Sequence, residues 1–248
     1  MSKSYEQLVG ELQTVIVDGT LYFIAEGDLL LTGDELQDYA RPDLGPRPSL
    51  GGRRLVVIHR HGQNITQPQG ITMRYCVVSE TFADETVYTA VAGHMAQACR
   101  DWQSICNVRF EHVAAKDAPG SDRSDLLFVV RYVDHPGTRT LASAFFPDYP
   151  PERRHVLIFP GFLHSGFSPS GVLRHELGHV LGFRHEHIRS EAPPECPDES
   201  LQDSKFLSQY DPRSIMHYFC GRVGSRELEF SEQDIQDAQA VYGPPEAQ

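Results

Sequence analysis

The stretch HELGHVLGFRHEH, residues 175–187, places four histidines and two glutamates within thirteen positions. On an α-helix, at about 100° per residue, His179 lies about 40° from His175 around the axis, so both imidazoles share one face. The apolar residues of the segment fall on the opposite face: Leu173, Leu177 and Val180. This pattern predicts a helix with one ligand-bearing side and one side in the core.

Gly182 follows this helical pattern and can take a left-handed backbone conformation at low cost. A turn at this glycine would end the helix and bring His185 back toward His175 and His179. Three imidazole ligands leave one position of a tetrahedral zinc ion open, which is how catalytic zinc sites differ from structural ones. The spacing therefore predicts that His175, His179 and His185 bind Zn²⁺.

Glu176 is the acidic residue next to the first of these histidines, and it is not itself placed to be a ligand. A metal lowers the pKa of a water at its open position. Glu176 is then the natural general base, taking the proton of that water and passing it to a leaving amine. The pattern fixes the residue type at five positions. At average residue frequencies, the expected number of chance matches in a chain of this length is on the order of 10⁻⁴ or less. The alternatives are a histidine-rich helix without metal and a closed structural zinc site.

Residues 175–189 resemble the astacin branch of the metzincin zinc endopeptidases, whose pattern reads HExxHxxGFxHExxR; the chain matches it, Phe183 included. SIMHY, residues 214–218, is similar to the astacin Met-turn. The resemblance implies that Met216 lies beneath the zinc. It also implies that Tyr218 is a catalytic residue, a displaceable fifth ligand whose hydroxyl then hydrogen-bonds the tetrahedral intermediate.

The resemblance covers about residues 55–243 and departs from the astacin pattern in places. Residues 190–192, Ser-Glu-Ala, stand where astacins have Asp-Arg-Asp, and the cysteine spacing differs from that of the astacin disulfides. Residues 140–147, TLASAFFP, and residues 230–243, FSEQDIQDAQAVYG, look more like the matrixin branch. There the first of these segments is an edge strand of the cleft, which an extended substrate can join.

The remaining segments provide the elements on which such a site would be mounted. Runs of β-branched and aromatic residues predict strands near residues 55–61, 71–78, 107–113, 125–133, 140–146 and 155–159. A long amphipathic helix is predicted by apolar residues at three- and four-residue steps: Val87, Val91, Met95, Ala98 and Trp102. Ser231 and Asp234 resemble a capping box that begins a final helix, and residues 188–212 are expected to be largely loop.

Together with the resemblance, these segments predict an α+β fold. The expected architecture is a metzincin-like catalytic domain with a mixed five-stranded sheet, a long active-site helix and a backing helix. A C-terminal subdomain would carry the Met-turn and the final helix. We expect this catalytic domain to span residues 55–248.

Residues 41–54, RPDLGPRPSLGGRR, are dense in proline, glycine and arginine and predict an exposed linker. We therefore expect residues 1–54 to be a prosegment and linker, released by cleavage in the linker, for instance at Arg53-Arg54. Astacins are kept latent by an aspartate in an FxGD motif, and AEGD, residues 25–28, is similar to it. We hypothesise that Asp28 is a fourth zinc ligand in the latent state. A plain Gly-Asp turn, and Asp34 as a rival ligand, are the alternatives.

The charge and hydropathy of the chain limit its partners. The net charge of −12 argues against binding to nucleic acid or to an anionic membrane, both of which need a cationic surface. No stretch approaches the ~20 apolar residues of a membrane span, and the N-terminus does not read as a signal peptide. The resemblance implies a secreted monomer that acts on protein or peptide substrates and has an activating protease as a partner.

Five cysteines include no close CxxC pair, so a cysteine zinc site is not expected. Two disulfides, Cys99 with Cys106 and Cys196 with Cys220, would leave Cys76 free; five reduced core cysteines are the alternative.

The other polar residues near the motif have less specific expectations. By resemblance, Glu186 meets the mature N-terminus after activation, and His187 faces solvent or the groups around the ligands. The scattered histidines are expected at the surface or around the site: His94, His112, His135, His155, His164 and His217. The sequence thus predicts a latent zinc endopeptidase. The alternative is a catalytically silent zinc-containing binding or inhibitory module whose N-terminal block is never removed.

Overall fold

The computed structural model describes residues 4–40, 55–197, 199, 204–207 and 209–246. The predicted linker, residues 41–54, and its expected cleavage point at Arg53-Arg54 lie outside the described residues. None of the helices in the described residues combines the length and the apolar composition that a membrane-spanning helix needs.

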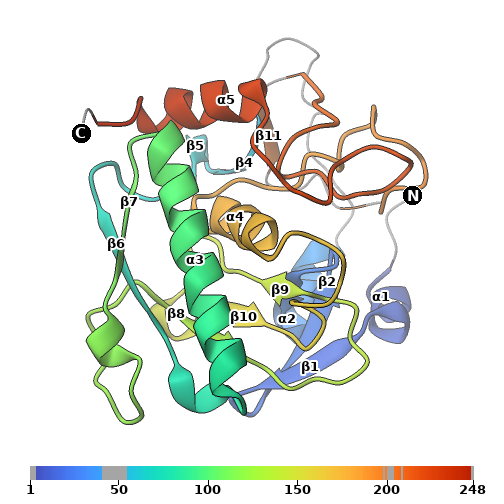
Figure 1. The fold of residues 1–248 in the computed structure, drawn as a ribbon. Helices are drawn as coiled ribbons and strands as arrows, with labels where there is room; N and C mark the ends of the chain where they lie inside the picture. Colours follow the sequence, from blue (N-terminus) through green and yellow to red (C-terminus); the bar gives the residue numbers. More distant parts are fainter. Residues whose placement is uncertain (1–3, 41–54, 198, 200–203, 208, 247–248) are drawn as a thin grey trace.

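A five-stranded sheet forms the centre of the molecule (Figure 1). Its strands, in order, are β7 (Arg109–His112), β6 (Thr72–Val77), β8 (Phe128–Tyr132), β10 (His155–Ile158) and β9 (Ala142–Ser143). The first four run parallel and β9 runs antiparallel to β10. The predicted mixed five-stranded sheet is confirmed, although β9 is much shorter than the strand expected over residues 140–146.

Two helices pack together against this sheet. Helix α3 (Glu85–Ile105) begins at the N-cap Asp84, whose side chain accepts a hydrogen bond from the Thr86 N–H. Helix α4 (Pro169–Val180) begins at the N-cap Ser168, with Pro169 in the first turn, where its missing N–H costs nothing. The Trp102 indole N–H donates to the Arg174 carbonyl at 2.8 Å and links the two helices.

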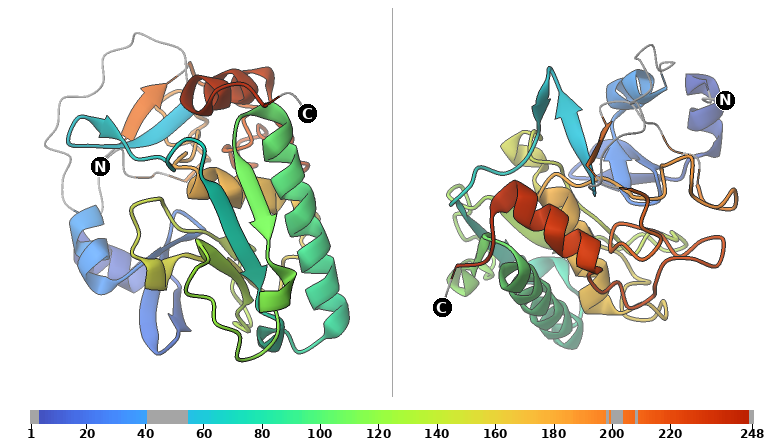
Figure 2. Two further views of the ribbon diagram at one scale, coloured as in Figure 1. Left: turned by 90° about the vertical axis from the view of Figure 1, so that its left-hand side faces the viewer. Right: turned by 90° about the horizontal axis from the view of Figure 1, so that it is seen from above.

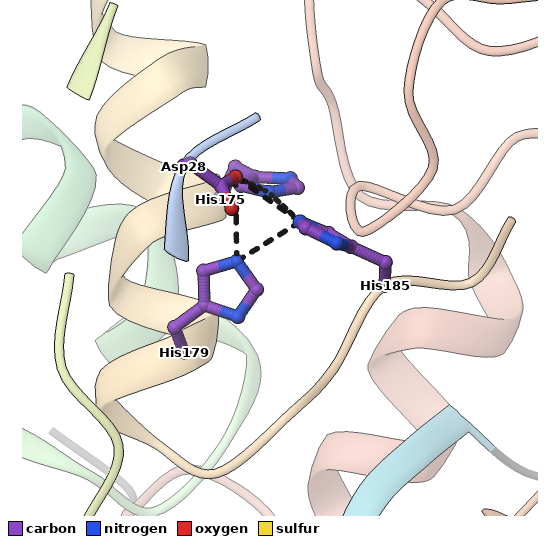
Figure 3. Close-up of side chains that lie close together, drawn as sticks. All are labelled: Asp28, His175, His179 and His185. Carbon is purple, nitrogen blue, oxygen red and sulfur yellow. Dashed lines mark hydrogen bonds and ion pairs between the residues drawn. The ribbon is translucent and has the colours of Figure 1, made fainter. Parts of the chain in front are cut away.

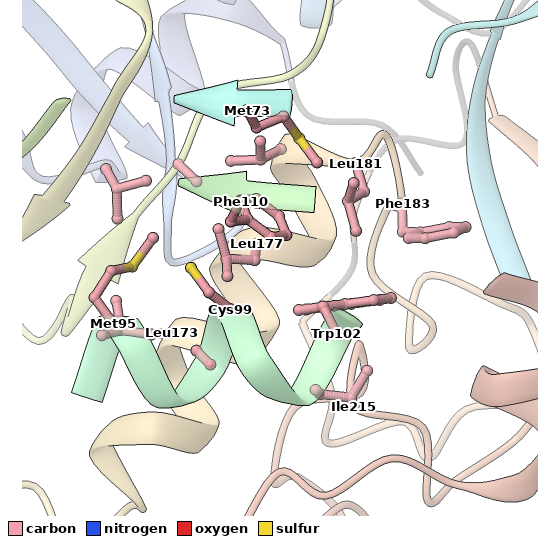
Figure 4. Close-up of a cluster of buried hydrophobic side chains, with 14 of the residues drawn as sticks. Met73, Met95, Cys99, Trp102, Phe110, Leu173, Leu177, Leu181, Phe183 and Ile215 are labelled. Atoms are coloured by element: carbon pink, nitrogen blue, oxygen red, sulfur yellow. The ribbon is translucent and has the colours of Figure 1, made fainter. Parts of the chain in front are cut away.

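The core lies between these helices and the sheet (Figure 4). The apolar residues predicted on the far side of α4 are buried here. Of the face predicted for α3, Val87 is partly buried and the others are buried: Val91, Met95, Ala98 and Trp102. Figure 4 draws Met95 and Trp102 of the α3 set and Leu173 and Leu177 of the α4 set. Because α4 buries this side, its other side is left to carry the histidines.

Helix α5 (Glu232–Tyr242) lies across the end of α3 (Figure 1). The predicted capping box is present: the Asp234 N–H donates to Ser231 Oγ, and the Ser231 N–H donates to the Asp234 carboxylate. Asp234 also accepts hydrogen bonds from the Ser214 hydroxyl and the Ile215 N–H. The same carboxylate therefore begins the final helix and fixes the SIMHY turn.

Short elements complete this part of the chain. Strand β4 (Leu55–Arg60) pairs with β5 (Gln63–Asn64) and with β11 (Ser204–Leu207), which lies in a region expected to be largely loop. Pairing with β4, distant in sequence, makes β11 a strand. Short 3₁₀ helices occur at Ser79–Thr81, Ala114–Lys116 and Pro151–Arg153.

The N-terminal block, residues 4–40, consists of α1 (Tyr5–Glu11), β1 (Thr14–Val17), β2 (Thr20–Ala25), β3 (Leu29–Leu31) and α2 (Gly33–Tyr39). Its three strands form their own antiparallel sheet. In Figure 2 the block, in blue, lies along the side of the molecule away from α3. It shares buried apolar clusters with the rest of the chain, where it meets Ile58, Phe146, Leu157 and Phe159.

One of the two expected disulfides is confirmed, and the other is wrong. Cys196 and Cys220 form a disulfide, whereas Cys76, Cys99 and Cys106 are buried free thiols. Cys99 lies within α3 and Cys106 is its C-cap residue. Seven residues of helix separate two Cα atoms by about 10 Å, beyond the ~7 Å that a disulfide can bridge.

Candidate metal centre

Helix α4 and the turn that follows it bring three histidines together. His175 and His179 lie one turn apart on α4, and the chain turns at Gly182, which has φ +97°. A Cβ at Gly182 would lie 2.2 Å from the Ile65 carbonyl oxygen, so the turn also needs glycine for this close approach. The turn returns His185 to the other two rings.

The Nε2 atoms of these histidines face one another (Figure 3). His185 Nε2 lies 3.2 Å from His175 Nε2 and 3.2 Å from His179 Nε2. Asp28 Oδ2 stands against them, at 3.3 Å from His175, 3.6 Å from His179 and 3.1 Å from His185. Ligands of a tetrahedral zinc ion at 2.0–2.1 Å would be about 3.3 Å apart. The four atoms therefore have the spacing of a zinc coordination shell.

The second nitrogen of each ring indicates which nitrogen is available to a metal. His175 Nδ1 lies 2.8 Å from the Ile215 carbonyl, and His179 Nδ1 lies 2.8 Å from the Phe183 carbonyl. His185 Nδ1 lies 3.0 Å from Glu199 Oε2. All three partners accept hydrogen bonds, so Nδ1 carries the proton and Nε2 presents its lone pair to the centre.

Charge at the centre also suits a cation. Burial lowers the pKa of His175 to about 4, so this ring is neutral, the state that binds metal. Burial acts in the same direction on His185, but the charges of Asp28 and Glu199 outweigh it and raise its pKa well above the usual value. The buried carboxylates thus favour a positive charge among the three rings. The donor set and its charge fit zinc.

Asp28 reaches the histidines from the hairpin between β2 and β3. Its Oδ2 also lies 2.6 Å from the Tyr218 hydroxyl, which is 2.5 Å from the Glu26 carbonyl oxygen. Gly27 precedes it with φ +87°, and a Cβ there would lie 2.9 Å from that hydroxyl. Asp34, the rival, lies in the first turn of α2. Of the two, Asp28 is the aspartate beside the histidines.

Glu176 is buried, and its Oε2 has no hydrogen-bond partner among the described residues. Burial raises the pKa of this carboxyl well above its usual value, and the negative charge of Asp28 raises it further. Glu176 lines a cavity of about 250 Å³ together with Asp28, His175 and Tyr218. The rest of its lining is mainly apolar and includes Leu141, Ala142, Phe167, Val172, Phe219 and Leu228. A group in this cavity can therefore be reached by the Glu176 carboxyl.

Met216 lies under α4. It is fully buried, and a Cβ added at Gly178 would lie 2.4 Å from its sulfur. The absence of a side chain at Gly178 thus lets the SIMHY turn pack directly against the helix that carries His175 and His179.

Glu186 and His187 are both buried. One oxygen of Glu186 forms an ion pair with Arg189 Nε at 2.8 Å and accepts a hydrogen bond from the Asp211 N–H at 3.0 Å. Burial raises the pKa of this carboxyl to about 8. The His187 ring is stacked at 4.9 Å on His185 and at 4.4 Å on Tyr218. Of the scattered histidines, His217 is also buried here, 2.7 Å from the Tyr210 hydroxyl.

Three polar residues around the histidine cluster were not predicted from the sequence. Arg184 donates to Glu26 at 2.7 Å, and both side chains are buried. Burial raises the pKa of Glu26, but the Arg184 charge outweighs it and lowers that pKa to about 2. Glu199 contacts His185 and His187. Arg184 occupies an unspecified position of the motif and Glu199 lies in a proline- and acid-rich segment, so neither offered a signal.

Comparisons with known proteins agree with this arrangement. No family model matches the chain. Zinc metalloproteinase nas-2 of Caenorhabditis elegans is 28% identical over 158 residues, covering 58% of this chain and 52% of that protein. Astacin-like metalloendopeptidase of Gallus gallus is 36% identical over 70 residues, covering 23% and 17%. The chain thus spans about half or less of the length of these relatives.

A solved structure, that of myroilysin, has a similar fold with a TM-score of 0.53 at 17% identity, covering 78% of this chain and all of that one. The chain and this solved structure share a fold, and the α+β architecture predicted from the sequence is confirmed. The relatives found by sequence are a zinc metalloproteinase and an astacin-like metalloendopeptidase. The predicted resemblance to astacin-like zinc metalloproteinases is therefore confirmed.

Proposed function

We propose that the protein is a latent zinc-dependent endopeptidase. One observation carries this proposal: three Nε2 atoms converge with an oxygen of Asp28, while each Nδ1 faces a hydrogen-bond acceptor. His175, His179 and His185 would hold Zn²⁺, with Asp28 as a fourth ligand in the latent state. When bound, the metal supplies a Lewis acid that activates water and polarises the scissile carbonyl.

Glu176 is proposed as the general base. Its carboxyl faces the cavity, and its raised pKa in the latent form has two causes, burial and the charge of Asp28. Departure of the N-terminal block would remove the second cause and admit water to the cavity. Both changes favour the ionised carboxylate that takes a proton from water and gives it to the leaving amine.

Tyr218 is proposed to stabilise the oxyanion. In the latent form its hydroxyl is held between Asp28 Oδ2 and the Glu26 carbonyl. Both partners belong to the N-terminal block, so its departure would leave the hydroxyl available to donate to a developing negative charge. The N-terminal block thus contacts both the three histidines and Tyr218 in the latent form.

The apolar cavity and the strand beside it support a peptide substrate. Strand β9 is an edge strand, since it pairs only with β10 in the described sheet. An extended peptide can join such an edge and place a side chain in the apolar cavity.

A catalytically silent zinc-containing binding module is the second candidate. The observation in its favour is the buried Glu26–Arg184 ion pair. Separating such a pair leaves buried charges without their partner, typically at a cost of 3–5 kcal/mol, which opposes release of the block.

The decisive experiment is casein hydrolysis before and after limited trypsin treatment of the full chain, with zinc content and N-terminal sequence determined on the same sample. We expect activity to appear only after cleavage between the block and residue 55. Glu176→Ala should keep its zinc and lose about 10²–10⁴-fold in rate. Zinc-loaded, cleaved protein without activity would support the binding module, and full activity in Glu176→Ala would reject the mechanism.

A further inference from the structure

Glu199 contacts two histidines through its two carboxylate oxygens. Its side chain is 1% exposed. Oε2 lies 3.0 Å from His185 Nδ1, and Oε1 lies 2.5 Å from His187 Nε2. A carboxylate accepts hydrogen bonds, so each of these nitrogens carries a proton.

We propose that Glu199 is the positioning residue of the zinc centre, an inference that rests on the proposed function. By accepting the Nδ1–H of His185 it holds that ring with the Nε2 lone pair toward His175 and His179. A carboxylate acceptor also makes the imidazole more basic and hence a better metal ligand. The other two ligands donate to backbone carbonyls, so His185 is the ligand whose orientation depends on a side chain.

The second oxygen of Glu199 orients His187, and His187 in turn contacts the backbone of Tyr218. Because His187 Nε2 donates to Glu199, its Nδ1 has a free lone pair, which accepts the Tyr218 backbone N–H at 3.4 Å. The His187 ring stacks on His185 and on Tyr218, with centroids 4.9 and 4.4 Å away, and those two rings also contact each other at 4.5 Å. Glu199 therefore positions a ligand and the segment that carries the proposed oxyanion donor together.

A disulfide holds the segment that carries Glu199 close to the segment that carries Tyr218. The Cys196–Cys220 disulfide joins a residue shortly before Glu199 to a residue shortly after Tyr218. The carboxylate and the tyrosine thus lie on chain segments that cannot separate far. This link lies in residues 55–248 and would persist after the N-terminal block leaves.

Glu26 is the other acidic group near His185 Nδ1, at 3.6 Å, and it pairs with Arg184. Glu26 belongs to the N-terminal block and would leave with it. Among the described residues, Glu199 then remains as the carboxylate on His185 Nδ1. The positioning role is therefore a property of the mature site as well as of the latent one.

The test compares Glu199→Gln with Glu195→Gln, an exposed glutamate of the same segment. Zinc affinity of the full chain is measured by competition with a chromogenic chelator. We expect Glu199→Gln to bind zinc about 10–100-fold more weakly, and Glu195→Gln to match the parent. Equal affinity in both variants would overturn the proposal.

Nitrogen-15 NMR of labelled histidines gives a readout that a purely structural role would not change. In the zinc-loaded parent we expect protons on His185 Nδ1 and His187 Nε2. In Glu199→Gln the amide N–H faces His187 Nε2, so the His187 proton should move to Nδ1. A parent protein with His187 protonated on Nδ1 would overturn the proposal, whether or not the variant folds.

These measurements separate the inference from the proposed function. Zinc affinity and tautomers are read without substrate, so a zinc-binding chain that hydrolyses nothing would reject the endopeptidase and leave the role of Glu199 standing. A hydrolytically active chain whose zinc affinity does not depend on Glu199 would reject the positioning role alone.

Discussion

Asp28 is the residue of the N-terminal block that lies against the Nε2 atoms of His175, His179 and His185. Its Oδ2 lies within 3.6 Å of all three Nε2 atoms and 2.6 Å from the Tyr218 hydroxyl. Asp34 has the same Gly-Asp sequence context but is exposed on α2. A substitution of Asp28 can therefore be compared with the same substitution of Asp34 as its control.

We expect Asp28→Ala to raise casein hydrolysis by the uncleaved chain by about tenfold or more. Under the proposed function, removing the carboxylate would free the fourth coordination position and the Tyr218 hydroxyl and so increase the catalytically competent fraction of the protein. Asp34→Ala should stay as inactive as the parent. An Asp28→Ala protein that remains as inactive as Asp34→Ala would show that this carboxylate does not maintain latency.

At the scale of elements, α3 and α4 each contain a glycine with different surroundings. Gly178 in α4 faces Met216 and Trp102, whereas a Cβ at Gly93 in α3 would meet nothing within 4 Å. In an open site, alanine stabilises a helix relative to glycine by about 0.5–1 kcal/mol. At Gly178 the same methyl group would displace a buried methionine.

Gly178→Ala should lower the free energy of unfolding by about 1–3 kcal/mol, because overpacking outweighs the gain in helix propensity. Gly93→Ala should raise it by about 0.5–1 kcal/mol. Urea titrations followed by circular dichroism measure both values. If Gly178→Ala proved as stable as Gly93→Ala, the close packing of the SIMHY turn under α4 would be contradicted.

Element boundaries were predicted well where the signal is local. Ser231 and Asp234 form the expected capping box, and the core face of α3 follows its sequence period. The strand expected over residues 140–146 shrinks to Ala142–Ser143, and β11 appears where loop was expected. Both differences arise because strand pairing depends on a distant partner, which a local pattern does not specify.

At the scale of the whole molecule, polar contacts help to attach the N-terminal block to the rest of the chain. Apart from the apolar contacts, Glu35 on α2 pairs with Arg153, whose guanidinium also donates to the Leu30 carbonyl at 3.0 Å. Burial raises the pKa of Glu35, but hydrogen bonds from Arg153 and the Thr32 N–H outweigh it and lower that pKa below 4.5.

Glu35→Gln keeps the capping box with Thr32 and removes the ion pair. Since the folded-state pKa lies below the usual 4.5, ionised Glu35 stabilises the protein above that pH, and its contribution is lost as the pH falls through the folded-state pKa. At pH 7 the variant should be less stable than the parent by about 1 kcal/mol or less, because the carboxylate is partly exposed.

The difference should shrink as the pH is lowered below 4.5. Urea titrations of the parent, Glu35→Gln and the control Asp34→Asn at pH 7 and at lower pH measure it. A difference that stays constant or widens on acidification would contradict this attachment.

The sequence by itself determined the helix that carries His175 and His179, the glycine turn to His185 and the capped final helix, because these features depend on residues close together in the chain. Only the tertiary structure decided that Asp28 meets a histidine 157 positions away, that Cys196 pairs with Cys220, and that Glu199 lies on His185 Nδ1. These contacts require separate segments to cross at one point. Packing of the N-terminal block and of the loops fixes that crossing, and local spacing carries no record of it.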